Sequence, residues 1–412
     1  MEKPEGDGGG ELDVHSAGPA EAAKWRFVRR RAFAVFQSHG YREVQPAPLE
    51  PAGTAARASR SAWPHAALAV DAATELRSDP VVSIARVYNH DDGGERFARL
   101  MTSGNVFDPE PEGPLRFRAW HAVSGLVLGA ADPGADAEVA ALCGTLAQDA
   151  GLADFEVVLG TLGDPGELER FLDATVEHRP LRCAACRGRG APLRFLTCAD
   201  EGCRALAAAA PPLRDFIGVA ALKHHEAVLA TLEASGFRVR DEPRLGFGAG
   251  RYQRTLIELR ARALTLPDRP ILTLARGGRR DGLIAALGGR AAPAVGLTVG
   301  VARAAACAPG EGEAYHTACE LFIAARGAAA RAWALKTAAG ERARGFRVDV
   351  ELRELGWAEQ LKRAERVRAR VVIVVGELER KNGQVAIRDM ASRETRHIPE
   401  ASLAAELKRL LR

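Results

Sequence analysis

The chain has 412 residues, of which 47% are hydrophobic and 27% charged, the composition of an ordinary globular protein. No apolar run reaches the length that spans a bilayer, so the sequence excludes a membrane-spanning protein and predicts no membrane partner. The length favours about two or three domains. A formal net charge of +4 is compatible with a nucleic-acid partner and with an arginine-rich solvated surface. It therefore does not distinguish between the two.

The N-terminal residues 1–18 are rich in Gly, Glu and Asp, which predicts a disordered leader. They contain no basic segment followed by an apolar one, so we expect no secretory signal and a cytoplasmic location. Seven cysteines in a chain without an export signal favour thiols or a metal site over a disulfide framework.

Apolar periodicity predicts the first elements in chain order. Trp25, Val28, Ala32, Val35 and Phe36 share one helical face, and Gly40 is placed to end that helix. The proline-rich segment 41–51 is expected to be extended, because its prolines forbid a helix. A long hairpin is predicted over residues 97–129, followed by a helix over 135–151 and a buried strand over 155–160.

After a linker-like stretch at 308–316, strands and helices alternate over residues 317–412, which predicts a separate small α/β domain with a largely parallel sheet. The chain closes with a helix on which Leu403, Leu407 and Leu410 share a face. Residues 19–307 would then form the larger domain, with a cysteine-bearing insertion at about 178–204.

Four of the cysteines, Cys183, Cys186, Cys198 and Cys203, follow the pattern C-x2-C-x11-C-x4-C. Two close pairs separated by a loop are typical of tetrahedral zinc sites, and four thiolates would leave no open position, so such a zinc would be structural. The alternative is that these are ordinary, partly buried residues of the insertion. For Cys143, Cys307 and Cys319 we expect core packing.

Several segments resemble the histidyl-tRNA synthetase family in order and spacing. "GGRRDGL", residues 277–283, is similar to the family's Gly-Gly-Arg-Tyr-Asp-Gly-Leu signature, and "LGFGAGRYQRTLIEL", residues 245–259, to its Arg-Gly-Leu-Asp-Tyr-Tyr-Thr segment. Residues 107–122 align without a gap on its motif 2 loop, and 364–390 resemble the end of its anticodon-binding domain. The resemblance implies an α+β class II catalytic domain, an antiparallel sheet with helices, followed by an anticodon-binding-like α/β domain.

The residues that would handle ATP in this family are partly replaced. Adenylation requires cations aimed at the α-phosphate. Asp108 stands where the resemblance places the motif 2 arginine, Pro111 where it places a second one, and Phe247 where it places the arginine of the Arg-Gly-Leu-Asp-Tyr-Tyr segment. The matching positions that retain their residues are Glu110, Arg116, Arg118 and the motif 3 arginine, Arg303. Arg303 could face ATP or pair with a local acid.

The histidine pocket implied by the resemblance is altered as well. The glutamate of Leu-Arg-Pro-Glu-Gly-Thr is shortened to Asp79 and its threonine becomes Val81. The remaining replacements are glutamine by Ala122, glutamate by Leu126 and tyrosine by Arg280, whereas Tyr252 persists. A pocket for imidazole needs buried partners of matching hydrogen-bond polarity. We therefore do not expect specific histidine binding.

Other features of this region leave alternatives open. Arg279 and Arg280, with Arg251 and Arg254 nearby, could form a pocket for an anionic ligand or simply a solvated arginine face. The glycine pairs 277–278 and 288–289 lack the lysine and hydroxyl residue of a phosphate loop, so we predict turns. For His121, His224 and His225 we expect packing or surface positions. "PAPLE", residues 46–50, departs from motif 1, through which class II enzymes dimerise, yet a homodimer is still expected.

The leading hypothesis is a catalytically inactive member of this family that binds tRNA, another RNA or a protein partner, with RNA bound through the basic C-terminal domain. Two alternatives remain. One is an active histidine–tRNA ligase with a rearranged site, for which ATP and Mg²⁺ would be cofactors. The other is a regulatory subunit of the ATP phosphoribosyltransferase type, which resembles the same catalytic domain but normally lacks the anticodon-binding domain.

Overall fold

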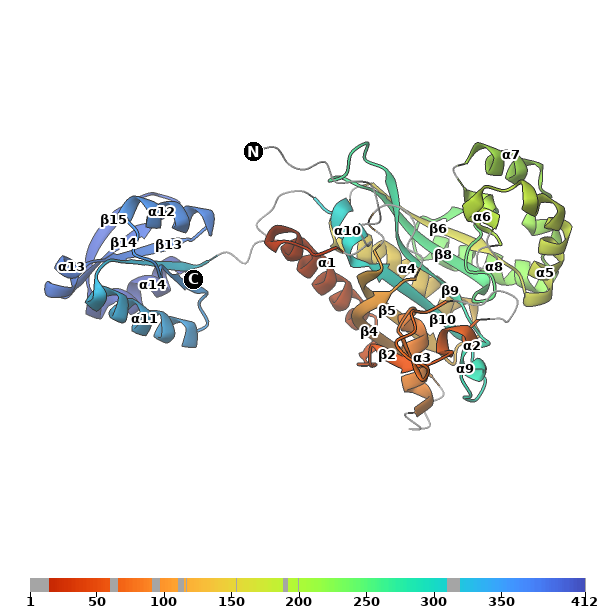
Figure 1. Cartoon of the computed structure of the whole chain (residues 1–412), viewed down its shortest axis with the longest axis horizontal. Helices are drawn as coiled ribbons and strands as arrows, with labels where there is room; N and C mark the ends of the chain where they lie inside the picture. The colour runs from red at the N-terminus through yellow and green to blue at the C-terminus, as the bar shows by residue number, and fades with distance from the viewer. Residues whose placement is uncertain are drawn as a thin grey trace. The chain divides into compact units, whose positions relative to one another are not determined.

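The computed structural model describes residues 15–59, 66–90, 97–109, 115, 117–152, 154–187, 192–198, 200–309 and 319–411. The described residues fall into two compact units, one within the range Met1–Glu311 and one within the range Gly312–Arg412 (Figure 1). Residues 1–14 of the expected leader and 310–316 of the expected linker lie outside the described residues. In the described part of the chain, no helix is long and apolar enough to cross a membrane.

The larger unit is built on a sheet of eight strands in the order β1-β4-β5-β10-β9-β8-β6-β7. The strands are β1 Arg42–Glu43, β4 Ala98–Phe107, β5 Ala119–Leu128, β6 Phe155–Thr161, β7 Arg240–Asp241, β8 Gln253–Arg262, β9 Ile271–Arg279 and β10 Ala294–Gly300. All neighbouring pairs are antiparallel except β1 with β4 and β6 with β7 at the two edges. The predicted hairpin is β4 and β5, and the predicted buried strand is β6.

Helices pack on both faces of this sheet because its strands alternate apolar side chains between them. The helices of the unit outside the insertion are α1 Pro19–Ser38, α2 Thr54–Arg57, α3 Pro80–His90, α4 Pro133–Asp149, α8 Val219–Ala234, α9 Leu283–Ala286 and α10 Val301–Cys307. Val123 and Val127 of β5 join the core beneath α1, α4, α8 and α10, whereas Leu126 and Leu128 join the core beneath α3 and α9. A small ladder of β2 Leu49–Pro51 and β3 Thr74–Leu76 lies outside the main sheet.

Local sequence signals explain where the predicted helices begin and end. In α1, Pro19 opens the helix, and Gly40 follows its end with a φ of +79°. In α4, Asp132 caps the first turn by accepting from the N–H of Gly134, and Pro133 occupies the first position. Both helices were expected from their apolar periodicity, and both are confirmed to within two residues.

The cysteine-bearing insertion covers the second face near β6 and β8. The insertion and the segments that flank it contain α5 Pro165–Ala174, the 3₁₀ turn Val176–Leu181, α6 Ala184–Arg187, the 3₁₀ turn Arg194–Thr197, α7 Glu201–Ala209 and the 3₁₀ turn Leu213–Phe216. Val158 of β6 and Leu256 of β8 belong to its core. Between this insertion and α3 with α9, the second face of the sheet presents β9 and β10, and the site described below lies there.

The smaller unit has a five-stranded sheet in the order β12-β11-β13-β14-β15. Its elements are β11 Leu321–Ala325, α11 Ala328–Ala343, β12 Val348–Val350, α12 Trp357–Arg366, β13 Val371–Val375, α13 Glu377–Lys381, β14 Gln384–Asp389, β15 Thr395–Pro399, the 3₁₀ turn Glu400–Ser402 and α14 Leu403–Leu411. Its first three strands are parallel, as predicted, while β14 and β15 extend the sheet antiparallel. The last helix buries Leu403, Leu407 and Leu411, and Leu410 is partly buried beside them.

Candidate functional site

Arg276 and Arg279 of β9, and Arg280 directly after it, do not all lie on the same face of the sheet. Arg279 contacts α4 on the first face. Arg276 and Arg280 contact the loop before β8 on the second face, where their guanidinium groups lie 4.9 Å from the Phe247 ring centre and 5.6 Å from the Tyr252 ring centre. The period of two along a strand therefore separates neighbours that are adjacent in the sequence.

Arg279 is almost completely buried and is bound by acidic residues. It donates to both carboxylate oxygens of Asp136 and, at 3.1 Å, to Asp281. It also donates to the backbone carbonyls of Ala130 and Asp132. Burial alone would raise the pKa of Asp136, but the adjacent His224 and the hydrogen bonds from Arg279 outweigh this effect and hold the pKa below its usual value. Arg279 thus ties α4 to the sheet.

Arg280 forms a second buried ion pair, with Asp79. Its Nη1 donates to Asp79 Oδ2 at 2.6 Å, and its Nη2 donates to the carbonyl of Ala58. The other carboxylate oxygen, Oδ1, accepts from the N–H of Val81 in the first turn of α3. Asp79 is therefore both the cap of α3 and the counter-charge of Arg280 (exposed fractions 8% and 2%).

These contacts correct the expectations for the arginine group. A solvated face is wrong for Arg279 and Arg280, since both are buried. An open anion pocket is also contradicted for these two, because each already lies against a carboxylate. Arg254 is likewise paired, donating to both carboxylate oxygens of Asp164. The sequence did not reveal Asp136 and Asp164 as partners, because they look like ordinary helix or turn acids, and Asp281 was noted only as part of the signature at 277–283.

The loop that carries Phe247 and Tyr252 is packed and apolar. The two rings meet edge to face with centres 5.5 Å apart. Arg276, which lies over Phe247, donates to Glu258 of β8 at 2.6 Å. Burial raises the pKa of Tyr252, so its hydroxyl stays protonated at neutral pH. Phe247 offers no hydrogen-bond donor at the position where the resemblance implies an arginine.

The β4–β5 hairpin carries the residues that match motif 2. Asp108 follows β4, and its backbone N–H donates to the carbonyl of Arg118 at 2.9 Å, which pairs the two strands beyond their ends. The Arg118 side chain is exposed. Glu110, Pro111 and Arg116 lie outside the described residues.

Farther along β5, the side chains on the second face are small or apolar. Ala122 and Leu126 are buried there, at the positions where the resemblance implies glutamine and glutamate, and between them the Ser124 hydroxyl donates to Thr298 at 3.0 Å. His121 lies on the other face with its ring nitrogens near Ser103 and Asn105. Burial and nearby arginines lower its pKa to about 4, so it is neutral at pH 7.

The other histidines and the motif 3 arginine have local partners. His224 and His225 are buried on α8, where Nε2 of His224 lies 3.4 Å from Asp136 and Nε2 of His225 lies 2.9 Å from Asp241. Both therefore pack, as expected. Arg303, on α10, donates to the backbone carbonyl of Thr273 on β9 at 2.9 Å.

One predicted turn is wrong. Gly277 and Gly278 lie inside β9, whereas Gly288 follows α9 in a turn, as predicted. A Cβ on Gly277 would stand 2.1 Å from the carbonyl oxygen of Gly296, so close strand packing, not a turn, requires glycine here.

Near the segment that matches motif 1, Glu50 is buried at the β2–α3 contact. It accepts from the Ser83 hydroxyl at 2.5 Å and lies 3.6 Å from Arg86. Burial raises its pKa above the usual value. Nothing in the sequence indicated that this glutamate would be one of the buried acids of the domain.

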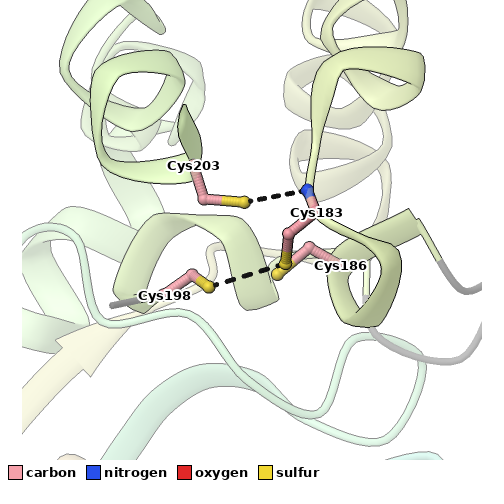
Figure 2. Close-up of side chains that lie close together, drawn as sticks. All are labelled: Cys183, Cys186, Cys198 and Cys203. Carbon is pink, nitrogen blue, oxygen red and sulfur yellow. Dashed lines mark hydrogen bonds between the residues drawn. The ribbon is translucent and has the colours of Figure 1, made fainter. Parts of the chain in front are cut away.

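The four cysteines of the insertion come together, as Figure 2 shows. Their sulfur atoms all lie within 4.8 Å of one another, and they form the one such group of His, Cys, Asp or Glu side chains found among the described residues. Cys143, Cys307 and Cys319 are buried elsewhere, which agrees with core packing.

The fold and the site together define a class II aminoacyl-tRNA synthetase-like catalytic domain followed by an α/β anticodon-binding domain. The family model described as histidyl-tRNA synthetase matches residues 13–178, and the anticodon binding domain model matches residues 321–410. A histidine–tRNA ligase of Thermosynechococcus vestitus is 30% identical over 411 residues, which cover 94% of this chain and 93% of that protein. The histidine–tRNA ligase of Anaeromyxobacter sp. is also 30% identical, with 94% and 96% covered.

Solved structures agree in fold. The apo histidyl-tRNA synthetase of S. aureus matches with a TM-score of 0.75 at 22% identity and covers 100% of both chains. A Bacillus halodurans structure described as an ATP phosphoribosyltransferase regulatory subunit/histidyl-tRNA synthetase matches with a TM-score of 0.63 at 20% identity, covering 91% of this chain and 99% of that one. The chain belongs to the histidyl-tRNA synthetase family, and the fold class expected from the sequence is confirmed.

Proposed function

We propose that this family member does not activate histidine and that it binds tRNA through its C-terminal domain. The observation that carries the first half is the buried ion pair between Arg280 and Asp79. The resemblance places a tyrosine and a glutamate of the histidine pocket at these two positions.

The pair leaves no carboxylate for the ammonium group of an amino acid. Both oxygens of Asp79 already accept hydrogen bonds, one from Arg280 and one from Val81. An ammonium group entering beside them would also meet the like charge of Arg280. Displacing Arg280 would leave its cation buried and unpaired, which costs about 3–5 kcal/mol for pairs of this kind. Ala122 and Leu126 offer an incoming imidazole no hydrogen-bond partner from their side chains.

The residues at the positions where the resemblance implies ATP-binding arginines support the same conclusion. The negative charge that develops on the α-phosphate must be met by cations already in place. Asp108 would oppose that charge, and the Phe247 ring cannot compensate for it. Arg276 lies over the Phe247 ring, but its guanidinium donates to Glu258 at 2.6 Å.

The C-terminal domain supports the second half of the proposal. It matches the anticodon binding domain model over residues 321–410. On α12, Lys362 and Arg366 are exposed one turn apart, and Arg363 between them is held by Asp349 and Glu351. Exposed cations on an ordered helix supply the salt-dependent attraction by which proteins hold a phosphate backbone.

Histidine-dependent exchange of pyrophosphate with ATP tests the first half. We expect no exchange above background and no detectable histidine binding by calorimetry in the same buffer. Exchange above background would overturn the proposal, because it requires both substrates in a working site.

Binding of histidine tRNA to the full chain, measured over a series of salt concentrations, tests the second half. We expect the double variant Lys362→Glu/Arg366→Glu to bind more weakly and to reduce the salt slope by about 2, one for each lost phosphate contact. The matched control is Lys223→Glu/Arg238→Glu, which makes the same charge change at exposed positions of the larger unit. Equal effects of both variants would contradict binding through α12.

A second candidate, an active histidine–tRNA ligase, is favoured by the relatives, which carry that name at 30% identity over nearly the whole chain. Positive exchange would establish it. A third, histidine-sensing regulation, is favoured by the description of the Bacillus halodurans structure. Histidine binding without exchange would establish that candidate. A homodimer and a cytoplasmic location belong to the same proposal, and light scattering on the purified chain tests the dimer.

A further inference from the structure

The four clustered cysteines come from three short segments of the insertion. Cys183 directly precedes α6, Cys186 lies on it, Cys198 follows the 3₁₀ turn Arg194–Thr197, and Cys203 lies in the first turn of α7. Figure 2 shows the four side chains converging from these segments. The spacing in the sequence therefore corresponds to one site in space.

The distances fit one tetrahedral ion. With zinc–sulfur bonds of about 2.3 Å, the sulfur atoms of a tetrahedral site lie about 3.8 Å apart. The sulfurs of Cys183 and Cys198 are 3.9 Å apart, and all four lie within 4.8 Å of one another. A multi-iron cluster would hold its cysteine sulfurs farther apart, because the ligands bind different metal atoms.

Backbone groups orient the ligands. The N–H of Cys183 donates to the sulfur of Cys203 at 3.3 Å, the kind of outer contact that stabilises a thiolate. Asp200 caps α7 and accepts from the N–H of Cys203 at 2.9 Å, which fixes the place of that residue in the helix. Cys186 and Cys203 are buried, and the other two are partly buried.

A buried arginine beside the cluster supplies an independent observation. Arg182, which precedes Cys183, is 5% exposed and stacks on Phe195 with its guanidinium 3.8 Å from the ring centre. It donates to the carbonyls of Pro192 and Thr175, but its Nε has no partner. In the described part of the chain, no carboxylate lies within ion-pair distance of Arg182. A buried cation without counter-charge is costly, and a zinc ion with four thiolates carries a charge of −2.

We propose that Cys183, Cys186, Cys198 and Cys203 bind one structural Zn²⁺ and that Arg182 balances the charge of this centre. The closed set of four thiolates leaves no position for water or substrate. The centre acts instead on the neighbouring loop. Gly246 packs against the insertion so closely that a Cβ there would lie 2.9 Å from Leu196, and the same loop carries Phe247. The metal thereby holds in place the loop that carries Gly246 and Phe247.

Elemental analysis of the full chain, purified without chelators, tests the proposal. We expect about one zinc per chain in the native protein. Cys183→Ser and Cys198→Ser, at the two partly buried positions, are each expected to lose most of the zinc. The control is Cys319→Ser, which makes the same change at a buried thiol that donates to a backbone carbonyl at 3.0 Å and should keep full zinc content.

Cobalt replacement makes the test independent of the variants. Native protein stripped of metal and titrated with Co²⁺ should show the visible bands of tetrahedral cobalt and thiolate charge transfer, saturating at one equivalent. Zinc removal should also lower the midpoint of thermal unfolding of the larger unit. Native protein without zinc that fails to bind cobalt tetrahedrally, or that contains iron instead, would overturn the proposal. Zinc retained by both serine variants would overturn the ligand assignment.

Discussion

Replacing Asp79 by alanine tests whether the Arg280 pair is a structural element of this domain. The change removes the counter-charge of a buried guanidinium and the side-chain cap of α3. Breaking a buried ion pair by deleting one partner costs about 3–5 kcal/mol, a range that includes the cap at about 1 kcal/mol. For a unit of this size, about 4 kcal/mol corresponds to a fall of roughly 8 °C in the unfolding midpoint.

Differential scanning calorimetry of the full chain measures this effect, because the two units can unfold in separate transitions. The control is Asp154→Ala, which breaks the pair with Arg262 that is largely exposed and should cost less than about 1 kcal/mol. The double variant Asp79→Ala/Arg280→Met should recover much of the loss, since an apolar replacement of a buried pair is often neutral. A loss for Asp79→Ala no larger than that of the control would refute the reasoning.

Three further outcomes are expected. The pKa of His121 is lowered from 6.5 to about 4 in the folded chain. As the pH falls, the imidazole is therefore protonated in the unfolded chain before it is protonated in the folded one. The free energy of unfolding accordingly decreases between about pH 6.5 and 4. Urea titration at pH 7.5 and 4.5 measures this loss. Because the ring is partly exposed, we expect the loss of unfolding free energy between the two pH values to be about 1–2 kcal/mol smaller in His121→Gln than in the native chain. Gly277→Ala should cost more than about 3 kcal/mol through its clash with β10, whereas Gly282→Ala, with open space around it, should be nearly neutral in the same titration. Asp108→Arg/Phe247→Arg should not restore pyrophosphate exchange while the buried ion pair remains, and exchange in this variant would contradict that pair's role.

The fold was predictable where one local signal was sufficient. The helices α1 and α4 follow from apolar periodicity and their proline starts, and the β4–β5 hairpin follows from two strand-like runs around a proline-rich turn. The antiparallel strands β14 and β15 were not predicted, because "QVAIRDM" and "ETRHIPE" are short and give no alternation strong enough to separate them from a loop.

The site was predictable as a location but not as a set of contacts. Asp79 and Arg280 stood out in the sequence as altered positions. They are 201 positions apart, however, and only the fold brings the two charges together. Arg279 and Arg280 looked like one arginine group because they are adjacent, although the strand places them on opposite faces. The clustering of the four cysteines was predictable, because the spacing typical of metal ligands is a local signal in the sequence.

The altered residues Asp79 and Arg280 are complementary in charge, which gives a physical reason for their occurring together. A pocket that binds an ammonium group contains a buried carboxylate that is unpaired until its ligand arrives, and such a group is costly in the empty protein. Once a pocket no longer binds the ligand, a cation from the protein can remove that cost permanently. Arg280 provides this cation here, and it also lies over Tyr252, the one aromatic residue of the implied pocket that persists. Under the proposed function, the contact that stabilises the fold also closes the pocket, so a variant that binds histidine would need both residues changed together.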